Sequence, residues 1–389
     1  MAEQDIAYNM EGIGSKLPDH SIYGQSPGRP GEKNQVCCTL CPRECRADRA
    51  AGRVGRCGVS EKLKIARAAL HYWEEPCISG TRGSGAVFFS GCSLGCIYCQ
   101  NRKISGGRVG QEISWERLAE IFLELQEGGA NNINLVTAGH YVPQVCCALD
   151  RARSQGLSIP IVYNSSGYEK VEALRQLEGL VDIYLPDLKY LDPELARQYS
   201  HAPDYPEAAV RALEEMVRQQ PKPEFLAESR WPKGGFPEEG QRTVSAILAE
   251  SRCPEHESAE ENQQLTAVEC QTLEASVPDR GTETGLPEPE AALLMRRGVI
   301  VRHLLLPGHV REAKRVVEYL YRTYGDRIYI SMMNQYTPMR EDFEDARLNR
   351  RVTRREYQRL LDYAMDLGVT QGFCQEGDTA SESFIPEFH

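Results

Sequence analysis

Three features are missing from this sequence of 389 residues. It has no run of about 18 apolar residues, the length that a membrane-spanning helix needs. Its first 15 residues contain no basic segment followed by an apolar one, so we expect no secretory signal and take the cytoplasm as the default compartment. Its basic residues form no stripe interleaved with aromatic residues, which argues against a nucleic-acid surface.

Acidic charge is concentrated in one part of the chain. The formal net charge is −11, and residues 219–292 alone hold 6 Lys and Arg against 15 Asp and Glu. That segment is rich in Glu, Pro, Ser, Gln and Thr, so it cannot bury enough apolar surface to offset the entropy of ordering it. We predict a mostly disordered insertion there, which either binds a partner or is a tolerated surface expansion. We also expect an irregular N-terminal arm over residues 1–36.

Outside the insertion, strands and helices alternate along the chain. Apolar runs predict strands at residues 86–90, 132–136, 159–163, 181–185, 299–306, 327–332 and 369–374. Helical spacing predicts helices at residues 115–127, 143–154, 169–178, 193–199, 205–218, 311–324 and 353–367. Repeated strand–helix units indicate an α/β fold with parallel strands, and six units favour a partial (β/α)6 TIM-type barrel over residues 81–218 and 293–389. The chemistry of such barrels lies in loops at the C-terminal ends of the strands.

The chain has fourteen cysteines, which is many for a protein expected in a reducing compartment. In such a compartment cysteines are more often metal ligands or catalytic groups than disulfides. Eight of them fall into two groups, within residues 37–57 and 92–99. We interpret the others as small buried or idle thiols: Cys77, Cys146, Cys147, Cys253, Cys270 and Cys374.

The second group follows a predicted strand directly and has the spacing C-x3-C-x2-C, with Cys92, Cys96 and Cys99. Three thiolates leave one iron of a 4Fe–4S cluster open to another ligand. A zinc knuckle is the alternative, but it needs a second pair of ligands about a dozen residues away, and no Cys or His stands at a suitable local spacing. Gly91 and Gly95 let the loop wrap closely around a bulky ligand. The motif therefore favours a cluster with an open iron.

The first group lies in a predicted metal-binding extension, residues 37–80. Its well-spaced candidate ligands are Cys38, Cys41, Cys45 and Cys57, and Cys37 could take the place of Cys38. Four thiolates make a closed site, which is either structural or relays electrons. Zinc and a second 4Fe–4S cluster both fit this pattern.

The three-cysteine motif resembles that of the radical S-adenosylmethionine (SAM) superfamily. The wider chain looks like a subgroup related to pyruvate formate-lyase activating enzymes, with matching stretches at residues 71–76, 132–137, 184–189, 302–308, 334–339 and 380–386. The resemblance implies that a reduced 4Fe–4S cluster cleaves SAM to a 5′-deoxyadenosyl radical, which abstracts hydrogen from a substrate. The implied partners are a glycyl-radical enzyme as substrate and a flavodoxin or ferredoxin as electron donor.

The same resemblance implies contacts to SAM. Related activases carry a Gly-Gly-Glu motif at the amino end of SAM, where this chain has Gly139 and, in place of the acid, His140. The position that contacts the ribose is occupied here by Asn164 and Ser166. Tyr98, just before the last cysteine of the motif, is a further candidate cofactor contact.

Asp187 and Lys189 are the candidate catalytic pair, and they are also candidate contacts to SAM. They follow the fourth predicted strand, where the alternation of side chains sends both to one face. Core packing explains such a pair poorly, because an unpaired buried charge is costly, and the related activases have the same Asp-x-Lys. The resemblance also implies that Arg302 binds the SAM carboxylate, which suits a planar guanidinium, and that Tyr336 contacts the adenine.

Three functions are compatible with these observations. The first is an activase that removes hydrogen from a glycine of a partner enzyme. The second is radical SAM modification of another peptide or a small molecule, which the first cysteine group favours because the simplest activases lack it. The third is a non-catalytic metal-binding interaction protein, with the acidic insertion as its working part.

Overall fold

The computed structural model describes residues 37–227, 266–267 and 293–375. The predicted N-terminal arm, most of the acidic insertion and the matching stretch at residues 380–386 lie outside the described residues. None of the described helices is long and apolar enough to cross a membrane.

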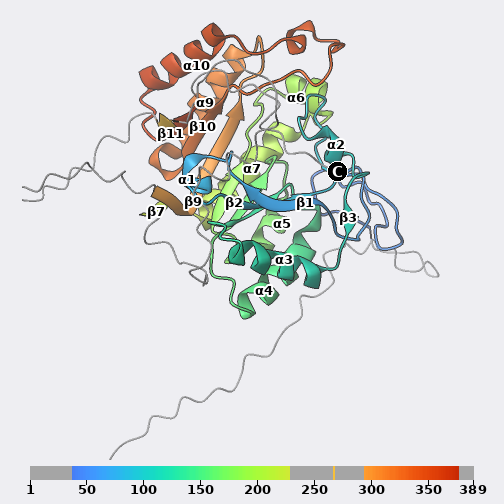
Figure 1. Cartoon of the computed structure of the whole chain (residues 1–389). Helices are drawn as coiled ribbons and strands as arrows, with labels where there is room; N and C mark the ends of the chain where they lie inside the picture. The colour runs from blue at the N-terminus through green and yellow to red at the C-terminus, as the bar shows by residue number, and fades with distance from the viewer. Residues whose placement is uncertain (1–36, 228–265, 268–292, 376–389) are drawn as a thin grey trace, which may run out of the picture.

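A parallel sheet forms the centre of the protein (Figure 1). Its parallel strands, in spatial order, are β2 (Ser84–Phe89), β4 (Ile133–Val136), β5 (Ile161–Ser165), β6 (Ile183–Pro186), β9 (Leu293–Leu304), β10 (Tyr329–Met333) and β11 (Gly372–Cys374). The sheet continues to β1 (Lys64–His71) and β3 (Gln111–Glu112) at one edge and to β8 (Thr266–Ala267) at the other, and it does not close. The predicted α/β fold with a partial barrel is therefore confirmed.

Helices connect the strands and flank the sheet (Figure 1). They are α3 (Trp115–Glu127), α4 (Val142–Ser154), α5 (Val171–Gln176), α6 (Pro193–Ser200), α7 (Tyr205–Gln219), α9 (Val310–Tyr324) and α10 (Arg354–Leu367), with the short α2 (Arg102–Ser105) after β2. Local sequence sets their ends: the Ser114 side chain accepts from the Arg117 N–H to start α3. Thr353 and Glu356 form a capping box that starts α10. The observed bounds of α3 are those predicted from the sequence.

The segment before β2, for which we predicted no strand or helix, contains two elements. Strand β1 pairs with β2 in antiparallel fashion, and the single-turn helix α1 (Pro76–Ser79) follows it. Cys77 and Ile78 of α1 pack with residues of β5, β6 and β9 in one apolar cluster. The side chains of Asn131 and Asn132, just before β4, donate to the Ser79 and Ile78 carbonyls. Helix α1 therefore closes the barrel interior at the N-terminal ends of the strands.

Two short parts of the acidic insertion have regular structure. Residues Glu224–Ala227, near the start of the segment expected to be disordered, form strand β7, which pairs in antiparallel fashion with the beginning of β9. Strand β9 begins at Leu293, six residues earlier than the predicted strand. The pair Thr266–Ala267 forms β8 beside β11. The described parts of the insertion thus extend the sheet.

The cysteine-rich residues 37–63 contain neither helix nor strand and pack against the loop after α2. A Cβ atom on Gly58 would lie 2.5 Å from the Gly106 carbonyl oxygen, and one on Gly107 would lie 2.4 Å from the Gly58 carbonyl oxygen. No side chain fits at either position. This backbone contact joins the first cysteine group to the loop after α2, and the Cys92 N–H, which donates to the Cys57 carbonyl, joins it to the second group.

Replacing Gly58 with alanine should destabilise the protein more than replacing Gly52. Both residues have left-handed φ angles, 80° and 79°, so alanine costs about 1–2 kcal/mol at either position. Only at Gly58 does the new methyl group overlap backbone, which adds about 1–3 kcal/mol, whereas Gly52 has open space around it. Thermal unfolding of the two variants measures the difference, and equal losses in Tm would contradict the close contact.

Candidate active site

A cavity of about 250 Å³ opens at the C-terminal ends of the parallel strands. The cysteine loop after β2 forms one wall, and the ends of β5, β6, β9 and β10 form the other. The predicted site residues that line it are Cys92, Cys96, Tyr98, Cys99, Asn164, Ser166, Asp187, Lys189 and Arg302. The structure therefore brings most of the predicted site together in one place.

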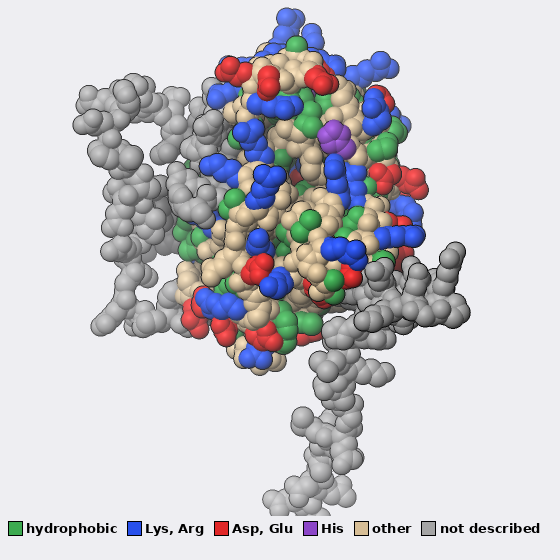
Figure 2. All heavy atoms as spheres, turned by 90° about the vertical axis from the view of Figure 1, so that its right-hand side faces the viewer, with side chains coloured by type: hydrophobic (Ala, Val, Ile, Leu, Met, Phe, Trp, Pro, Cys, Tyr) green, Lys and Arg blue, Asp and Glu red, His purple; other side chains and the backbone are tan. Residues whose placement is uncertain are grey.

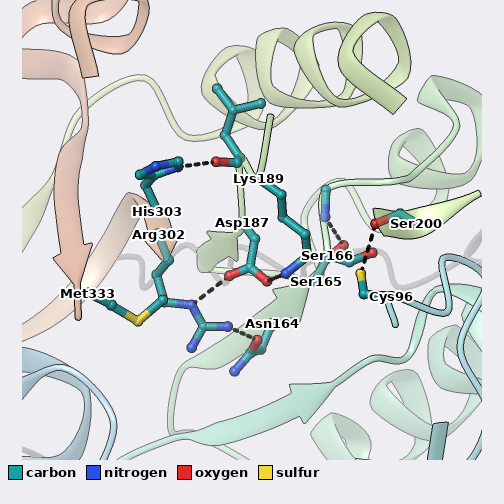
Figure 3. A network of polar contacts seen from close by, with 12 residues as sticks. Cys96, Asn164, Ser165, Ser166, Asp187, Lys189, Ser200, Arg302, His303 and Met333 are labelled. Atoms are coloured by element: carbon teal, nitrogen blue, oxygen red, sulfur yellow. Dashed lines mark hydrogen bonds and ion pairs between the residues drawn. The ribbon is translucent and has the colours of Figure 1, made fainter. Parts of the chain in front are cut away.

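The cysteine loop is held by its surroundings. The Cys92 N–H donates to the Cys57 carbonyl, and Ser200 Oγ donates to Cys96 Sγ over 3.1 Å (Figure 3). Burial raises the pKa of the Cys96 thiol and raises that of Cys99 to about 12, because a thiolate is poorly solvated there. Iron would supply the missing positive charge, so three thiols on one loop fit a 4Fe–4S cluster with an open iron.

Asp187, Lys189 and Arg302 form an ion-paired network on the opposite wall (Figure 3). Lys189 Nζ lies 2.7 Å from Asp187 Oδ2, and Arg302 Nε lies 3.1 Å from Asp187 Oδ1. Leu188 between them is buried in the core, as the predicted alternation requires. Burial raises the pKa of Asp187, but the charges of Lys189 and Arg302 outweigh it and hold the pKa below its usual range. Asp187 therefore stays ionised.

Asn164 and Ser166 lie at the end of β5, beside this network. Asn164 Oδ1 accepts a hydrogen bond from the Arg302 guanidinium over 2.5 Å (Figure 3). Tyr98 lines the cavity from the other wall, and its buried hydroxyl accepts from Tyr190. These polar groups stand where a ligand between the two walls would meet them.

Sequence reasoning did not select Glu74 and Glu75 as site residues. Glu74 Oε2 lies 3.2 Å from Arg302 Nη1, and its Oε1 accepts from Asn134 over 3.0 Å. Glu75 also lines the cavity, and its buried Oε2 has no hydrogen-bond partner. Burial raises the pKa of both carboxyl groups. The resemblance at residues 71–76 could have pointed to these acids. Only the fold reveals that the turn before α1 places them inside the barrel.

Two residues assigned to the amino end of SAM do not line the cavity. A Cβ atom on Gly139 would lie 2.4 Å from Glu169 Oε2, so that residue packs against a buried acid instead. His140 is 3% exposed, and its Nε2 donates to the Ser90 carbonyl over 2.8 Å. Burial lowers the pKa of His140 to about 3, so the ring stays neutral and supports the backbone below the cysteine loop.

Tyr336, assigned to the adenine, does not line the cavity either. Its hydroxyl donates to the Leu348 carbonyl, and its ring lies against Tyr98 with centroids 6.2 Å apart. The neighbouring Gln335 lines the cavity in its place. Its carbonyl accepts from Gln100, a residue just after the cysteine motif.

The first cysteine group does not line the cavity but lies behind its cysteine wall. Cys38, Cys41 and Cys57 are buried, and Cys45 is exposed. Within residues 37–227, 266–267 and 293–375, no group of three or more His, Cys, Asp or Glu side chains is arranged to hold a metal ion as it stands. A metal at either cysteine group would thus be accompanied by movement of the thiols.

Three comparisons with known proteins were made. The model of the Radical SAM superfamily matches residues 86–222. An uncharacterized protein of Methanocaldococcus jannaschii is 29% identical over 175 residues, which are 43% of this chain and 50% of that protein. The chain thus spans about half the length of this curated relative. The crystal structure of Streptococcus suis SuiB matches with a TM-score of 0.38 and 10% identity, over 75% of this chain and 48% of that chain.

Replacing Arg302 with methionine should cost about 3–5 kcal/mol of unfolding free energy at pH 8, because it leaves Glu74 buried without its cation and leaves Asp187 with Lys189 alone. Arg297→Met on the same strand is the control and should cost about 0–1 kcal/mol, since its ion pair is half exposed. Urea unfolding measures both.

The difference between wild type and Arg302→Met should shrink as the pH falls to 5. In the wild type the pKa of Asp187 is depressed, so its stabilising contribution is present above the unfolded pKa and is lost only as the pH falls through the folded pKa. In the variant Glu74 has lost its ion pair, so it takes up a proton at a higher pH than in the wild type. Protonation removes the cost of burying its unpaired charge. A difference that is small at pH 8, or that grows on acidification, would contradict the network.

Proposed function

We propose that this chain, whose residues 86–222 match the Radical SAM superfamily model, is an enzyme that takes a hydrogen atom from a substrate bound in its cavity. One observation carries the proposal: the three-cysteine motif and the ion-paired network of Asp187, Lys189 and Arg302 face the same cavity. A cluster with an open iron needs charged side chains nearby to orient a charged cofactor. This cavity has the cysteine loop on one wall and the charged side chains on the other.

The proposal gives each wall of the cavity a role. Cys92, Cys96 and Cys99 would hold a 4Fe–4S cluster whose open iron accepts the amino and carboxylate groups of SAM. Together, the reduced cluster and SAM supply the 5′-deoxyadenosyl radical. Lys189 and Arg302 offer cations to the SAM carboxylate, and ionised Asp187 can accept a hydrogen bond from the SAM amino group. Asn164 and Ser166 would form hydrogen bonds with the ribose hydroxyls.

The proposed hydrogen donor is a glycine of a partner glycyl-radical enzyme. The resemblance to pyruvate formate-lyase activating enzymes supports this, because Asp187, Lys189 and Arg302 match residues of those activases. A glycine on another protein must reach the cavity from outside. Trp73 lines the cavity and is 55% exposed, so the cavity extends to the surface there.

A second candidate is radical modification of another peptide or of a small molecule. The observation that favours it is the first cysteine group, which contacts the cysteine loop through the Cys57 carbonyl and would give the enzyme an auxiliary metal site. A non-catalytic interaction protein has less support, because binding alone does not require buried ion pairs around a cavity.

The proposed electron donor is an acidic carrier such as a flavodoxin or ferredoxin. Lys and Arg side chains are spread over the face shown in Figure 2, the right-hand side of Figure 1, where the cysteine-rich loops and α2 lie. Exposed basic residues of these loops include Arg46, Arg56, Arg102, Lys103 and Arg108. A positive surface near the cluster loop would steer an acidic protein toward it.

After anaerobic reconstitution with iron and sulfide, the protein should convert SAM to 5′-deoxyadenosine when dithionite is added. Cys96→Ala should abolish this product, because the cluster loses one of three ligands. Cys147→Ala on α4, which lies outside the cavity lining, should keep the wild-type rate. Chromatography of the quenched reactions measures the product. Equal product from wild type and Cys96→Ala would contradict the proposal.

The hydrogen donor has its own test. The reduced protein and SAM, incubated with candidate glycyl-radical enzymes, should give the doublet EPR signal of a glycyl radical on one of them. A substrate carrying deuterium at that glycine should return the label in 5′-deoxyadenosine. Production of 5′-deoxyadenosine without a glycyl signal from any candidate would favour the second function.

A further inference from the structure

The thiols of the first cysteine group are gathered around a few shared contacts. The position of a Cβ on Gly55 is 3.0 Å from Cys45 Sγ and 3.5 Å from Cys57 Sγ, so both sulfurs border that glycine. The N–H groups of Arg46 and Glu44, on either side of Cys45, donate to the Cys38 and Cys41 carbonyls. The four cysteines are therefore gathered in one small region.

A buried cation lies beside these thiols. Arg49 is 2% exposed, and its Nη1 is 3.9 Å from Cys38 Sγ. The same guanidinium donates to the Ser60 and His140 carbonyls, which fixes it in place. A fixed positive charge beside Cys38 would offset part of the negative charge that four thiolate ligands bring to a metal site.

The turn that carries Cys45 has an unusual backbone. Its two neighbours, Glu44 and Arg46, have φ angles of 40° and 53°. Residues other than glycine rarely adopt such angles, which are strained and persist where the surroundings impose them. Cys45 is also exposed while its three partners are buried. This turn is therefore the part of the group that can close on a ligand.

One side chain of the same turn binds the cluster loop. The Arg43 guanidinium donates to the Ser93 and Leu94 carbonyls of that loop, at 3.0 and 2.9 Å. It also donates to the Ser200 and His201 carbonyls at the end of α6. Ser200 in turn donates to the Cys96 thiol, so Arg43 reaches the cluster loop by two routes.

We propose that Cys38, Cys41, Cys45 and Cys57 hold a second metal centre with four thiolate ligands, and that this centre fixes the cluster loop through Arg43 and the Cys57 carbonyl. On binding, each thiol releases its proton to solvent and its sulfur bonds to the metal, with no redox change. The centre is either a 4Fe–4S cluster or a zinc ion, since both accept four thiolates. The effect of this centre on the cluster loop rests on the proposed function, whereas the metal site itself does not.

Metal content tests the site. Wild type, the variant with Cys38→Ala and Cys41→Ala, and the variant with Cys92→Ala, Cys96→Ala and Cys99→Ala are compared, as isolated and after anaerobic reconstitution with iron and sulfide. For a second cluster, the double variant should bind roughly half the iron of wild type, and the triple variant should retain the other half. For zinc, as-isolated zinc should persist in the triple variant and vanish from the double variant.

The result that overturns the site is metal content independent of Cys38 and Cys41. The triple variant keeps the test independent of SAM cleavage, so failure of the proposed function leaves this result readable. It also covers the case in which the double variant does not fold, because metal retained by the triple variant must be held outside the cavity. A triple variant without bound iron or zinc would likewise overturn the site.

The coupling is tested at Arg43. Arg43→Gln should keep both metals but lower the rate of 5′-deoxyadenosine formation at least tenfold, and it should alter the change that SAM causes in the EPR spectrum of the reduced cluster. Arg53→Gln is the control, because this arginine belongs to the same cysteine-rich segment and its side chain is 61% exposed. Arg43→Lys should fall between the two. Wild-type rate and spectrum in Arg43→Gln would overturn the coupling.

Discussion

One buried guanidinium connects the parts of the barrel interior. Arg302 on β9 pairs with Glu74 from the turn before α1 and with Asp187 after β6, and it donates to Asn164 on β5. Taking these charges out of water is costly, and good geometry is what offsets the cost. Each partner therefore depends on the others being in place. The network therefore fixes the position of α1 relative to the ends of three strands. These contacts give one wall of the cavity a defined shape.

The same interior carries an imbalance of charge. Glu74, Glu75 and Asp187 line the cavity with Lys189 and Arg302, so three acids face two cations. Burial raises the pKa of both glutamates, which means that the interior resists holding all three acids ionised. A ligand that brings positive charge relieves this conflict. SAM carries a sulfonium and an ammonium group against a single carboxylate, so its charge complements the cavity proposed to bind it.

The residues that could be foreseen from the sequence are those set by local periodicity. Asp187 and Lys189 share a face because strand alternation is a local rule, and the cysteine loop follows β2 because chain order requires it. Glu74 could not be placed, since its role depends on α1 folding into the far end of the barrel. His140 and Tyr336 follow strands where cavity residues were expected. Instead, His140 donates a hydrogen bond to the Ser90 carbonyl and Tyr336 donates one to the Leu348 carbonyl. Local sequence does not predict such long-range contacts.

The two cysteine groups show how irregular loops are held without helices or strands. The carbonyl groups of Ser93 and Leu94 have no strand beside them, and a buried carbonyl without a donor is costly. Arg43 satisfies both, and it can do so only while the turn of residues 41–45 keeps its place. That turn includes the left-handed Glu44 and the exposed Cys45. A metal bound by its thiols would tie the turn to the buried cysteines, and the guanidinium would pass that restraint to the cluster loop.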